Sequence, residues 1–247
     1  MPPLAKDAVP KRFDSVARRY DQMQLLNLGY HEDLGRSAAR LGASAGARIL
    51  DLCCGTGLST HALVKRYPQA RITALDASGA MLDAARAKPA LSRVRFVHGD
   101  AHDPEAAGAE GPFDAVFMAY GIRNLSEPDR CLTRLRRLLV PGGRIAFHEY
   151  LLEGSLYSRA IWNLVSSAVI VPIGWALSGS PELFRYLRRS VNEFDTVERF
   201  ETRIRTAGFE HVHTRTMRGW QHRIVHTVVA CRPSDERPRD APWPTAD

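Results

Sequence analysis

Cysteine is scarce in this sequence. The four cysteines, Cys53, Cys54, Cys131 and Cys231, form no Cys-x-x-Cys pair, and no histidine stands near them at zinc-finger spacing. The two adjacent cysteines cannot easily bridge each other, because a disulfide needs Cα atoms about 4.4–6.8 Å apart. This pattern argues against a structural zinc site and predicts four reduced thiols, as in a cytoplasmic protein.

Signals for export and for nucleic-acid binding are absent as well. The N-terminal segment MPPLAKDAVPKRF lacks the apolar run of a secretory signal. A net charge of +7 could favour nucleic acid or an anionic membrane surface. The arginines, however, are spread along the chain, and neither a basic stripe with exposed aromatics nor an RNA-binding module is visible. We therefore predict a cytoplasmic protein with no nucleic-acid partner.

The chain of 247 residues is long enough for one large α/β domain with an added cap. Two helical patterns, RFDSVARRYDQMQLL and YHEDLGRSAARL, meet at Gly29 and predict an N-terminal helical lid over residues 1–41. The main domain is expected over 42–232, with a helical cap at 155–190. The tail at 233–247, rich in proline and acidic residues, is expected to be disordered.

Strand-like and helical patterns alternate through the main domain. The apolar runs RILDLCC, RITALD, VRFVHGD, FDAVFMAY and GRIAFHEY are separated by helical segments such as LSTHALVKRY, AMLDAARA and PDRCLTRLRRLL. This alternation predicts a parallel sheet with helices on both faces. After the cap, the helix TVERFETRIRTAG and the strands HVHTRTM and IVHTVVACR would complete the sheet.

The segment 161–177 is apolar enough to suggest a membrane span. It is short for a span of ~20 residues, contains Asn163, Ser166 and Ser167, and is interrupted by Pro172. One interpretation is a buried pair of helices. The other is an apolar lid over a lipophilic substrate, in contact with the bilayer surface.

The segment ARILDLCCGTGLST contains a glycine loop. Gly55 and Gly57, with Thr56 between them, follow a strand and open a helix, so that backbone amides can approach a ligand closely. Thr60 stands where a dinucleotide fingerprint has its third glycine, and no Gly-Lys-Ser/Thr follows. The loop therefore predicts a nucleotide-type cofactor without polyphosphate.

Carboxylates follow the first three strands. Asp76 ends the second strand, where it can accept bonds from both ribose hydroxyls, and Asp100 ends the third, where it can receive an adenine amino group. Asp51, just before the glycines, can hold the loop or an ammonium group. Together they predict a cofactor with a ribose, an adenine and a positively charged amino-acid end.

The motifs ILDLCCGTG, ITALDAS, VHGDA and LLVPGGRIAF, in this order, resemble those of class I S-adenosylmethionine-dependent methyltransferases. The resemblance implies a Rossmann-like α/β fold with a mostly parallel, seven-stranded sheet, and S-adenosylmethionine (SAM) as cofactor. In this interpretation Cys53 and Cys54 are compact wall residues of the cofactor loop.

Other segments are similar to the ubiquinone/menaquinone C-methyltransferase family over residues 12 to about 212. The matches include FDSVARRYD, the GIRN run at 121–124 and the RYLxxS run at 185–190. The resemblance implies C-methyl transfer to the ring of a lipophilic, prenylated quinol. It further implies a set of site residues: cofactor contacts from Tyr20, Thr60, Asp76, Asp100 and Ala101, with Arg123 facing the reacting ring.

Further site candidates follow from position and chemistry. Met81 is expected against the adenine. Arg123 can stabilise the phenolate that makes a quinol carbon nucleophilic. The general base is left open among His148, Glu149, Asp129 and Tyr120, which stand near strand ends.

The chain departs from the family pattern at Ala119 and in the C-terminal segment MRGWQHRIVHTVVACRP, with Trp220, His222 and His226. In these departures the chain resembles a divergent relative of the family, the rhodoquinone biosynthesis protein. This resemblance implies that a methoxy group of ubiquinone is replaced by an amino group, with SAM as the amino donor and a divalent metal such as Mn²⁺. A further alternative is O- or N-methylation of an aromatic specialised metabolite. A homodimer and a location peripheral to the inner membrane are also left open.

Overall fold

The computed structural model describes residues 6, 12–14, 17, 20–21, 29–178 and 182–234. Its strands are β1 (Arg48–Leu52), β2 (Arg71–Asp76), β3 (Arg95–His98), β4 (Phe113–Ala119), β5 (Leu139–Tyr150), β6 (Glu210–Thr216) and β7 (Val225–Cys231). Its α-helices are α2 (Tyr30–Leu41), α3 (Leu58–Arg66), α4 (Gly79–Arg86), α5 (Pro128–Leu138), α6 (Leu156–Val165), α7 (Val171–Ser178), α8 (Glu182–Glu193) and α9 (Val197–Thr206). Short turns of helix lie at η2 (Pro89–Leu91), η3 (Ile122–Asn124), η4 (Ser166–Ile170) and η5 (Gly219–Gln221).

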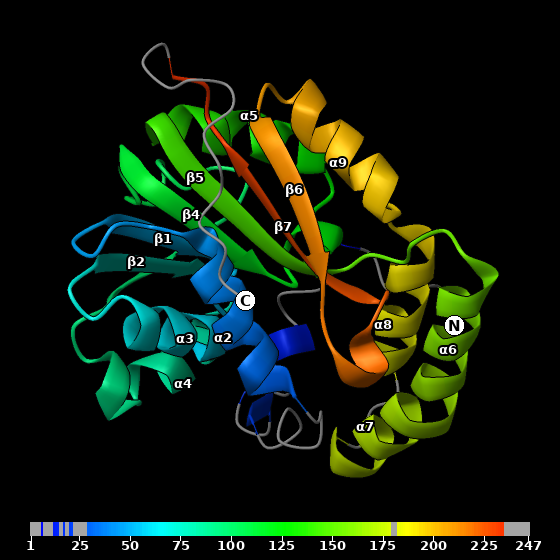
Figure 1. The fold of residues 1–247 in the computed structure, drawn as a ribbon. Helices are drawn as coiled ribbons and strands as arrows, with labels where there is room; N and C mark the ends of the chain where they lie inside the picture. Colours follow the sequence, from blue (N-terminus) through cyan, green and yellow to red (C-terminus); the bar gives the residue numbers. More distant parts are fainter. Residues whose placement is uncertain are drawn as a thin grey trace.

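The seven strands form one sheet in the order β3-β2-β1-β4-β5-β7-β6. Strands β1 to β5 pair in parallel, and β7 joins antiparallel to both β5 and β6. The mostly parallel sheet expected from the alternating pattern is therefore confirmed (Figure 1). The order reverses beside β1, and such a switch point is where open α/β sheets bind ligands, at the carboxyl ends of their strands.

Helices cover both faces of the sheet (Figure 1). On one face α2 and α3 pack against alternate strand residues in a cluster that includes Leu41, Leu63 and Phe117. On the other face α5 and α9 pack through a second cluster that includes Leu135, Phe200 and Phe147. Because both faces are covered, the central strands are apolar on both sides, which explains their continuous hydrophobic runs.

The helix over YHEDLGRSAARL is confirmed as α2, which begins after Gly29 in a left-handed conformation. Most of the first expected helix, and the tail from residue 235, lie outside the described residues. Within the segment 29–41, α2 packs against α3 and β5.

The cap segment differs from the expectation. Helices α6 and α7 are joined through the π-helical turn η4, so the chain stays helical from Leu156 to Ser178 and continues through Pro172. In η4 the Val171 amide donates to the carbonyl of Ser166, five residues back, and this wider turn adjoins the proline, which has no N–H to donate. The interpretation as a buried pair of helices is wrong, because only 17% of the most apolar 18-residue stretch of this helix is buried.

Candidate active site

The loop between β1 and α3 forms a tight backbone cradle. Cys53, Gly55 and Gly57 have φ values of 59°, 53° and 81°, all in the left-handed region that favours glycine. A Cβ on Gly57 would lie 2.6 Å from Leu91 Cδ1 and 3.2 Å from Ala85 Cβ. The sequence needs glycine here both for the turn and for the close approach of α4.

This loop lines a cavity of about 650 Å³ at the carboxyl ends of the strands. Nine of the residues expected at the site line it: Tyr20, Gly55, Thr56, Asp76, Met81, Asp100, Ala101, Tyr120 and Arg123. Cys53 and Cys54 form part of its wall, as expected. Four others lie behind the wall: Asp51, Gly57, Thr60 and His148.

Asp76 and Asp100 present carboxylates to the cavity in different environments. Asp76 Oδ2 accepts from the Gly55 amide at 2.8 Å and Oδ1 from the Ser78 amide at 2.9 Å. Burial raises the pKa of Asp76 and outweighs these bonds. Partial burial acts in the same sense on Asp100, but the hydrogen bonds from the His102 amide and ring, both at 2.8 Å, prevail and lower its pKa.

Asp51 and Thr60 differ from the expected cofactor contacts. Both are fully buried, and Thr60 Oγ1 donates to Asp51 Oδ2 at 2.6 Å instead of facing the cavity. The Ser59 hydroxyl donates to the same oxygen at 2.8 Å, so Asp51 anchors the first turn of α3. Burial raises the pKa of Asp51 to about 7. Its Oδ1 has no hydrogen-bond partner among the described residues, which leaves one buried acceptor behind the loop.

A group of aromatic rings was not anticipated from the sequence. The ring of Tyr120 stacks on Tyr30 with centroids 5.7 Å apart and lies 4.8 Å from Tyr150, which contacts Trp162 at 4.9 Å. Tyr120 has a φ of 54°, a strained conformation for a residue with a Cβ. Tyr30, Tyr120 and Tyr150 all line the cavity, so this part of its wall is aromatic.

Arg123 lies beside this aromatic wall, next to Tyr150. It is only 4% exposed and forms an ion pair with buried Glu149 through Nη1 and Oε1. Arg123 Nε donates to Ser190 Oγ at 3.0 Å, and the guanidinium lies 5.7 Å from the centroid of the Tyr150 ring. A buried charge requires such partners, because desolvation alone would make it very costly. The guanidinium is therefore held rigidly where it lines the cavity.

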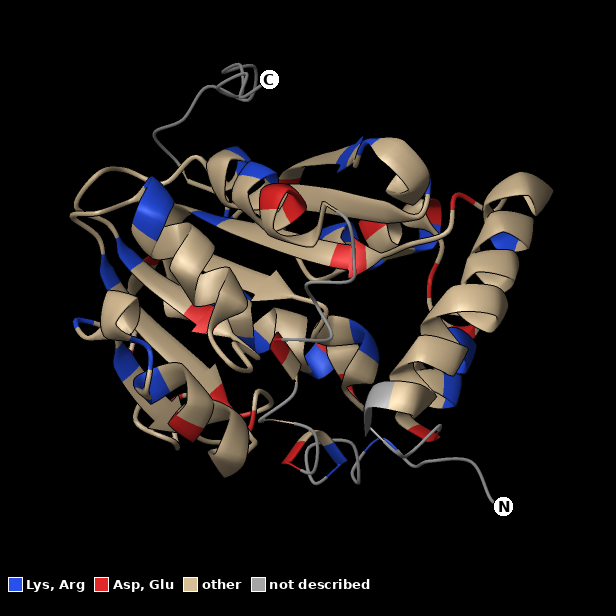
Figure 2. Ribbon diagram, turned by 90° about the horizontal axis from the view of Figure 1, so that it is seen from below, with Lys and Arg blue, Asp and Glu red and all other residues tan. Residues whose placement is uncertain are grey.

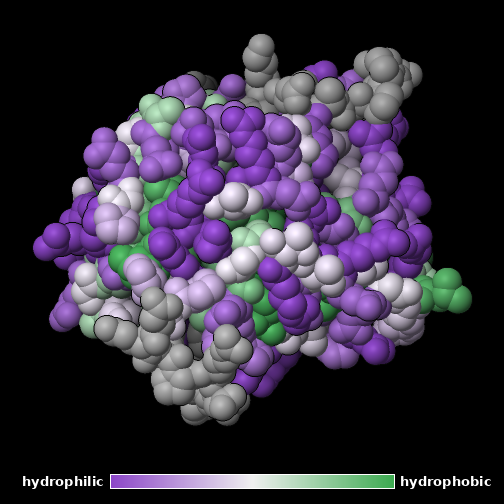
Figure 3. Space-filling model, turned by 90° about the horizontal axis from the view of Figure 1, so that it is seen from above, coloured by the Kyte–Doolittle hydropathy of each residue, from purple (hydrophilic) through white to green (hydrophobic). Residues whose placement is uncertain are grey.

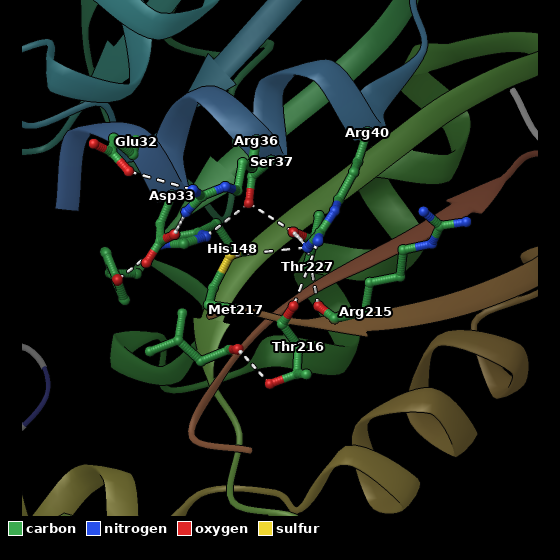
Figure 4. Close-up of polar contacts among 12 residues, drawn as sticks. Glu32, Asp33, Arg36, Ser37, Arg40, His148, Arg215, Thr216, Met217 and Thr227 are labelled. Atoms are coloured by element: carbon green, nitrogen blue, oxygen red, sulfur yellow. Dashed lines mark hydrogen bonds and ion pairs between the residues drawn. The ribbon is translucent and has the colours of Figure 1, made fainter. Parts of the chain in front are cut away.

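His148 belongs to a hydrogen-bond network that includes Ser37, Thr227 and Arg40 (Figure 4). Its Nε2 lies 2.8 Å from Tyr120 Oη and its Nδ1 lies 2.8 Å from Ser37 Oγ. Ser37 continues to Thr227 Oγ1 at 2.6 Å, and Arg40 Nη1 donates to that oxygen at 2.9 Å. Burial, with smaller contributions from Arg40 and His226, lowers the pKa of His148 to about 3. The imidazole is therefore neutral at neutral pH. It lies behind Tyr120, outside the cavity wall.

The low pKa of His148 predicts a pH-dependent contribution to stability. An unfolded histidine takes up a proton near pH 6.5, whereas His148 in the folded protein stays neutral until about pH 3. Between these values the unfolded chain binds more protons, so this contribution is present above pH 6.5 and is lost as pH falls. In urea unfolding, replacing His148 by Gln is expected to reduce the stability loss between pH 8 and pH 5 by about 2 kcal/mol. An equal loss in both proteins would show that His148 is charged in the fold.

The unusual C-terminal segment does not reach the cavity. Gln221 and His226 are buried, and His226 Nε2 lies 3.3 Å from Glu153 Oε1. Trp220 and His222 are likewise absent from the cavity wall. The residues that set this ending apart from the family pattern therefore lie outside the cavity wall.

Among the described residues, no three His, Cys, Asp or Glu side chains lie together as a metal site would require. The divalent metal that the amino-transfer alternative requires therefore has no support among the described residues.

The sheet order, the glycine loop after β1 and the carboxylate that ends β2 define the Rossmann-like fold of class I methyltransferases. Two solved structures illustrate the shared fold. The [4+2]-cyclase SpnF aligns with a TM-score of 0.68 at 17% identity, over 94% of this chain and 97% of that one. Human N-acetylserotonin methyltransferase in complex with SAM gives 0.63 at 17% identity, over 95% and 61%.

The chain belongs to the ubiE/COQ5 methyltransferase family, whose model matches residues 2–227. It is 32% identical to the demethylmenaquinone methyltransferase of Chlamydia pneumoniae, over 84% of this chain and 90% of that protein. It is 35% identical to the ubiquinone/menaquinone biosynthesis C-methyltransferase UbiE of Methylobacterium nodulans, over 84% of each. The expected fold class and family are confirmed, and the protein is a SAM-dependent methyltransferase.

The described residues fit SAM. Gly55 lines the cavity with open space where a Cβ would stand, and the carboxylates of Asp76 and Asp100 line the same cavity. Thr56 and Met81 supply polar and apolar lining beside them. Hydroxyl and amino groups of a nucleoside can donate to these carboxylates.

Proposed function

We propose that this enzyme transfers the methyl group of SAM to a ring carbon of a lipophilic, prenylated quinol. The observation that carries the proposal is the position of Arg123, which is buried in the aromatic wall of the same cavity that the glycine loop lines. A flat aromatic acceptor suits stacking between tyrosine rings. The names of the relatives support C-methyl transfer, and no observation of the described residues favours amino transfer or O- or N-methylation.

The guanidinium of Arg123 has a direct role in this chemistry. A quinol carbon becomes nucleophilic when the neighbouring hydroxyl loses its proton, and a fixed cation stabilises the resulting phenolate without exchanging protons itself. SAM supplies a methyl group on a positively charged sulfur. The ring carbon gains the methyl and loses its hydrogen as a proton, and S-adenosylhomocysteine is the second product.

Tyr120 and His148 are proposed to act together on the substrate side. Tyr120 lines the cavity, and its hydroxyl bonds to His148, which has no surface in the cavity. With its low pKa, His148 is a weak base at neutral pH. We assign it to positioning: its hydrogen bond to Tyr120 fixes the orientation of the Tyr120 hydroxyl on the side of the acceptor.

The cap is proposed to close the substrate side. Leu183, Phe184 and Leu187 of α8 line the cavity together with Tyr20 and Phe13 from the N-terminal segment. Such a lid excludes water and strengthens the electrostatic interaction of Arg123 with a bound phenolate.

The homodimer remains a prediction, and light scattering of the purified protein tests it.

An acceptor comparison tests the proposed function. The purified enzyme is incubated with SAM and one of three acceptors, and release of S-adenosylhomocysteine is measured. A prenylated demethyl-quinol is expected to be methylated far faster than a catechol, which offers hydroxyl groups for O-methylation. The same quinol with its ring position already methylated serves as the control. With this acceptor the enzyme should release no S-adenosylhomocysteine. Equal rates on the blocked and unblocked quinols would contradict ring-carbon transfer.

A further inference from the structure

The helix from Leu156 to Ser178 carries an unusual surface. The exposed large hydrophobic side chains of the described residues all lie on it: Leu156, Tyr157, Leu164, Val169, Ile173 and Trp175. Leu156 is 88% exposed, Leu164 68% and Trp175 61%. By contrast, the face of the molecule seen in Figure 3 is mainly hydrophilic. So concentrated an apolar surface marks an interaction site.

The exposed apolar residues of this helix from Leu156 to Ala176, which include the six large ones, form a stripe that the π turn keeps aligned. Positions 156, 160, 164, 168, 172 and 176 are all exposed and follow one another at intervals of four. In a pure α-helix such a series drifts around the axis by about 40° per step. The wider turn at Ser166–Ile170 rotates the chain in the opposite sense, so the stripe faces one direction over both α6 and α7.

The opposite face of this helix is fixed to the protein. Trp162 is fully buried and its Nε1 donates to the Arg188 carbonyl at 3.3 Å, while Asn163 Oδ1 accepts from Asn192 at 3.1 Å. The helix is long and apolar enough to cross a membrane by length and composition alone. Crossing would carry the polar partners on α8 into the hydrocarbon, which is very unfavourable. The attachment therefore suits a helix that lies in the plane of the interface.

Charge identifies the kind of surface that would receive the stripe. Between residues 155 and 193 the chain has four arginines and two glutamates, and Arg159 is the only charged residue of the helix itself. The helix is almost wholly tan at the right edge of Figure 2. Arg159, Arg185 and Arg188 are exposed beside the apolar surface. Cations around an apolar stripe match the headgroups of anionic lipids.

The same helix lies next to the substrate side of the cavity. Phe184 lines the cavity, and a Cβ on Gly174 of α7 would lie 2.4 Å from its ring. Leu183 and Leu187, on the same helix α8, line the cavity as well. Apolar side chains thus continue from the cavity, through Phe184, to the helix that carries the stripe.

We propose that the helix from Leu156 to Ser178 docks this enzyme in the plane of an anionic lipid bilayer, and that the prenyl tail of the acceptor passes beside Phe184 between α7 and α8. The docking part stands on the exposed stripe alone, whereas the tail path rests on the proposed function.

Vesicle co-sedimentation of the full chain tests the docking. The probe is a vesicle of phosphatidylglycerol and phosphatidylcholine. The double variant Leu164→Glu/Trp175→Glu is expected to lower the partition coefficient by at least about 100-fold, because two exposed apolar side chains that the bilayer would bury are lost. The control Ala90→Glu/Ala106→Glu adds the same charge at two exposed positions away from the stripe, and should bind within about twofold of the wild type.

Melting curves and activity on a short-chain, water-soluble quinol confirm that each variant is folded and intact. Wild-type protein that stays in the supernatant, or equal binding by the stripe variant, would overturn the docking. A dimer that the stripe variant dissociates, without vesicle binding, would assign the stripe to a second copy instead and also overturn it. A wild type that binds vesicles but methylates no quinol would refute the proposed function and leave the docking intact.

Discussion

Replacing Arg123 by Met is expected to lower kcat/KM about 10²–10³-fold, the usual cost of losing one preorganised group that stabilises charge in the transition state. The variant should also lose about 3–5 kcal/mol of unfolding free energy, because Glu149 would be left buried without its partner. Steady-state kinetics on the prenylated quinol and urea unfolding measure the two effects separately.

The double variant Arg123→Met/Glu149→Gln separates catalysis from stability. In the wild type, Glu149 Oε1 accepts a hydrogen bond from the Tyr150 backbone N–H at 2.9 Å. The neutral amide of Gln keeps an oxygen for this bond and removes the uncompensated charge. We expect most of the lost stability to return while kcat/KM stays low. If activity returns together with stability, Arg123 is a structural residue and the phenolate has another partner.

Replacing Gly57 by Ala is expected to raise the Kd for SAM at least about tenfold. A residue with a Cβ pays about 1–2 kcal/mol at a left-handed backbone position, and here the new methyl also meets Leu91 and Ala85. Relief requires the loop to move away from α4, which displaces the amides that face the cofactor. Isothermal titration with SAM measures the change.

Gly35 provides the matched control for this substitution. It lies inside α2 with an ordinary φ, and nothing stands within 4 Å of its added Cβ. Gly35→Ala should leave the Kd for SAM unchanged and stabilise the protein by about 1 kcal/mol, since alanine favours helices. Equal SAM affinity in wild type and Gly57→Ala would contradict the role given to the loop.

The parts of the fold that could be predicted are those with local signals. Buried parallel strands leave continuous apolar runs, and the turn at Gly55 and Gly57 requires glycine at the two positions where the sequence has it. Asp76 ends β2 and Asp100 stands two residues after β3, so the shared edge of a parallel sheet brings them to one cavity. Each of these inferences depends on neighbours in the sequence.

The parts that could not be predicted depend on distant contacts. Tyr30 and Tyr150 join Tyr120 only after α2 packs across β5, and nothing in their local sequence marks them as cavity residues. Thr60 turns inward to Asp51 because that buried carboxylate needs donors. Pro172 alone predicts a break in the cap helix, but the π turn before it changes the hydrogen-bond pattern and the chain stays helical.

The position of the transferred methyl group tests the central claim most directly. The enzyme is incubated with a prenylated demethyl-quinol and SAM carrying a deuterated methyl group, and the product is analysed by mass spectrometry and NMR. We predict one deuterated methyl group on a ring carbon, with both hydroxyl groups free. A deuterated methyl on oxygen, or an amino group in place of a ring methoxy group, would contradict C-methyl transfer.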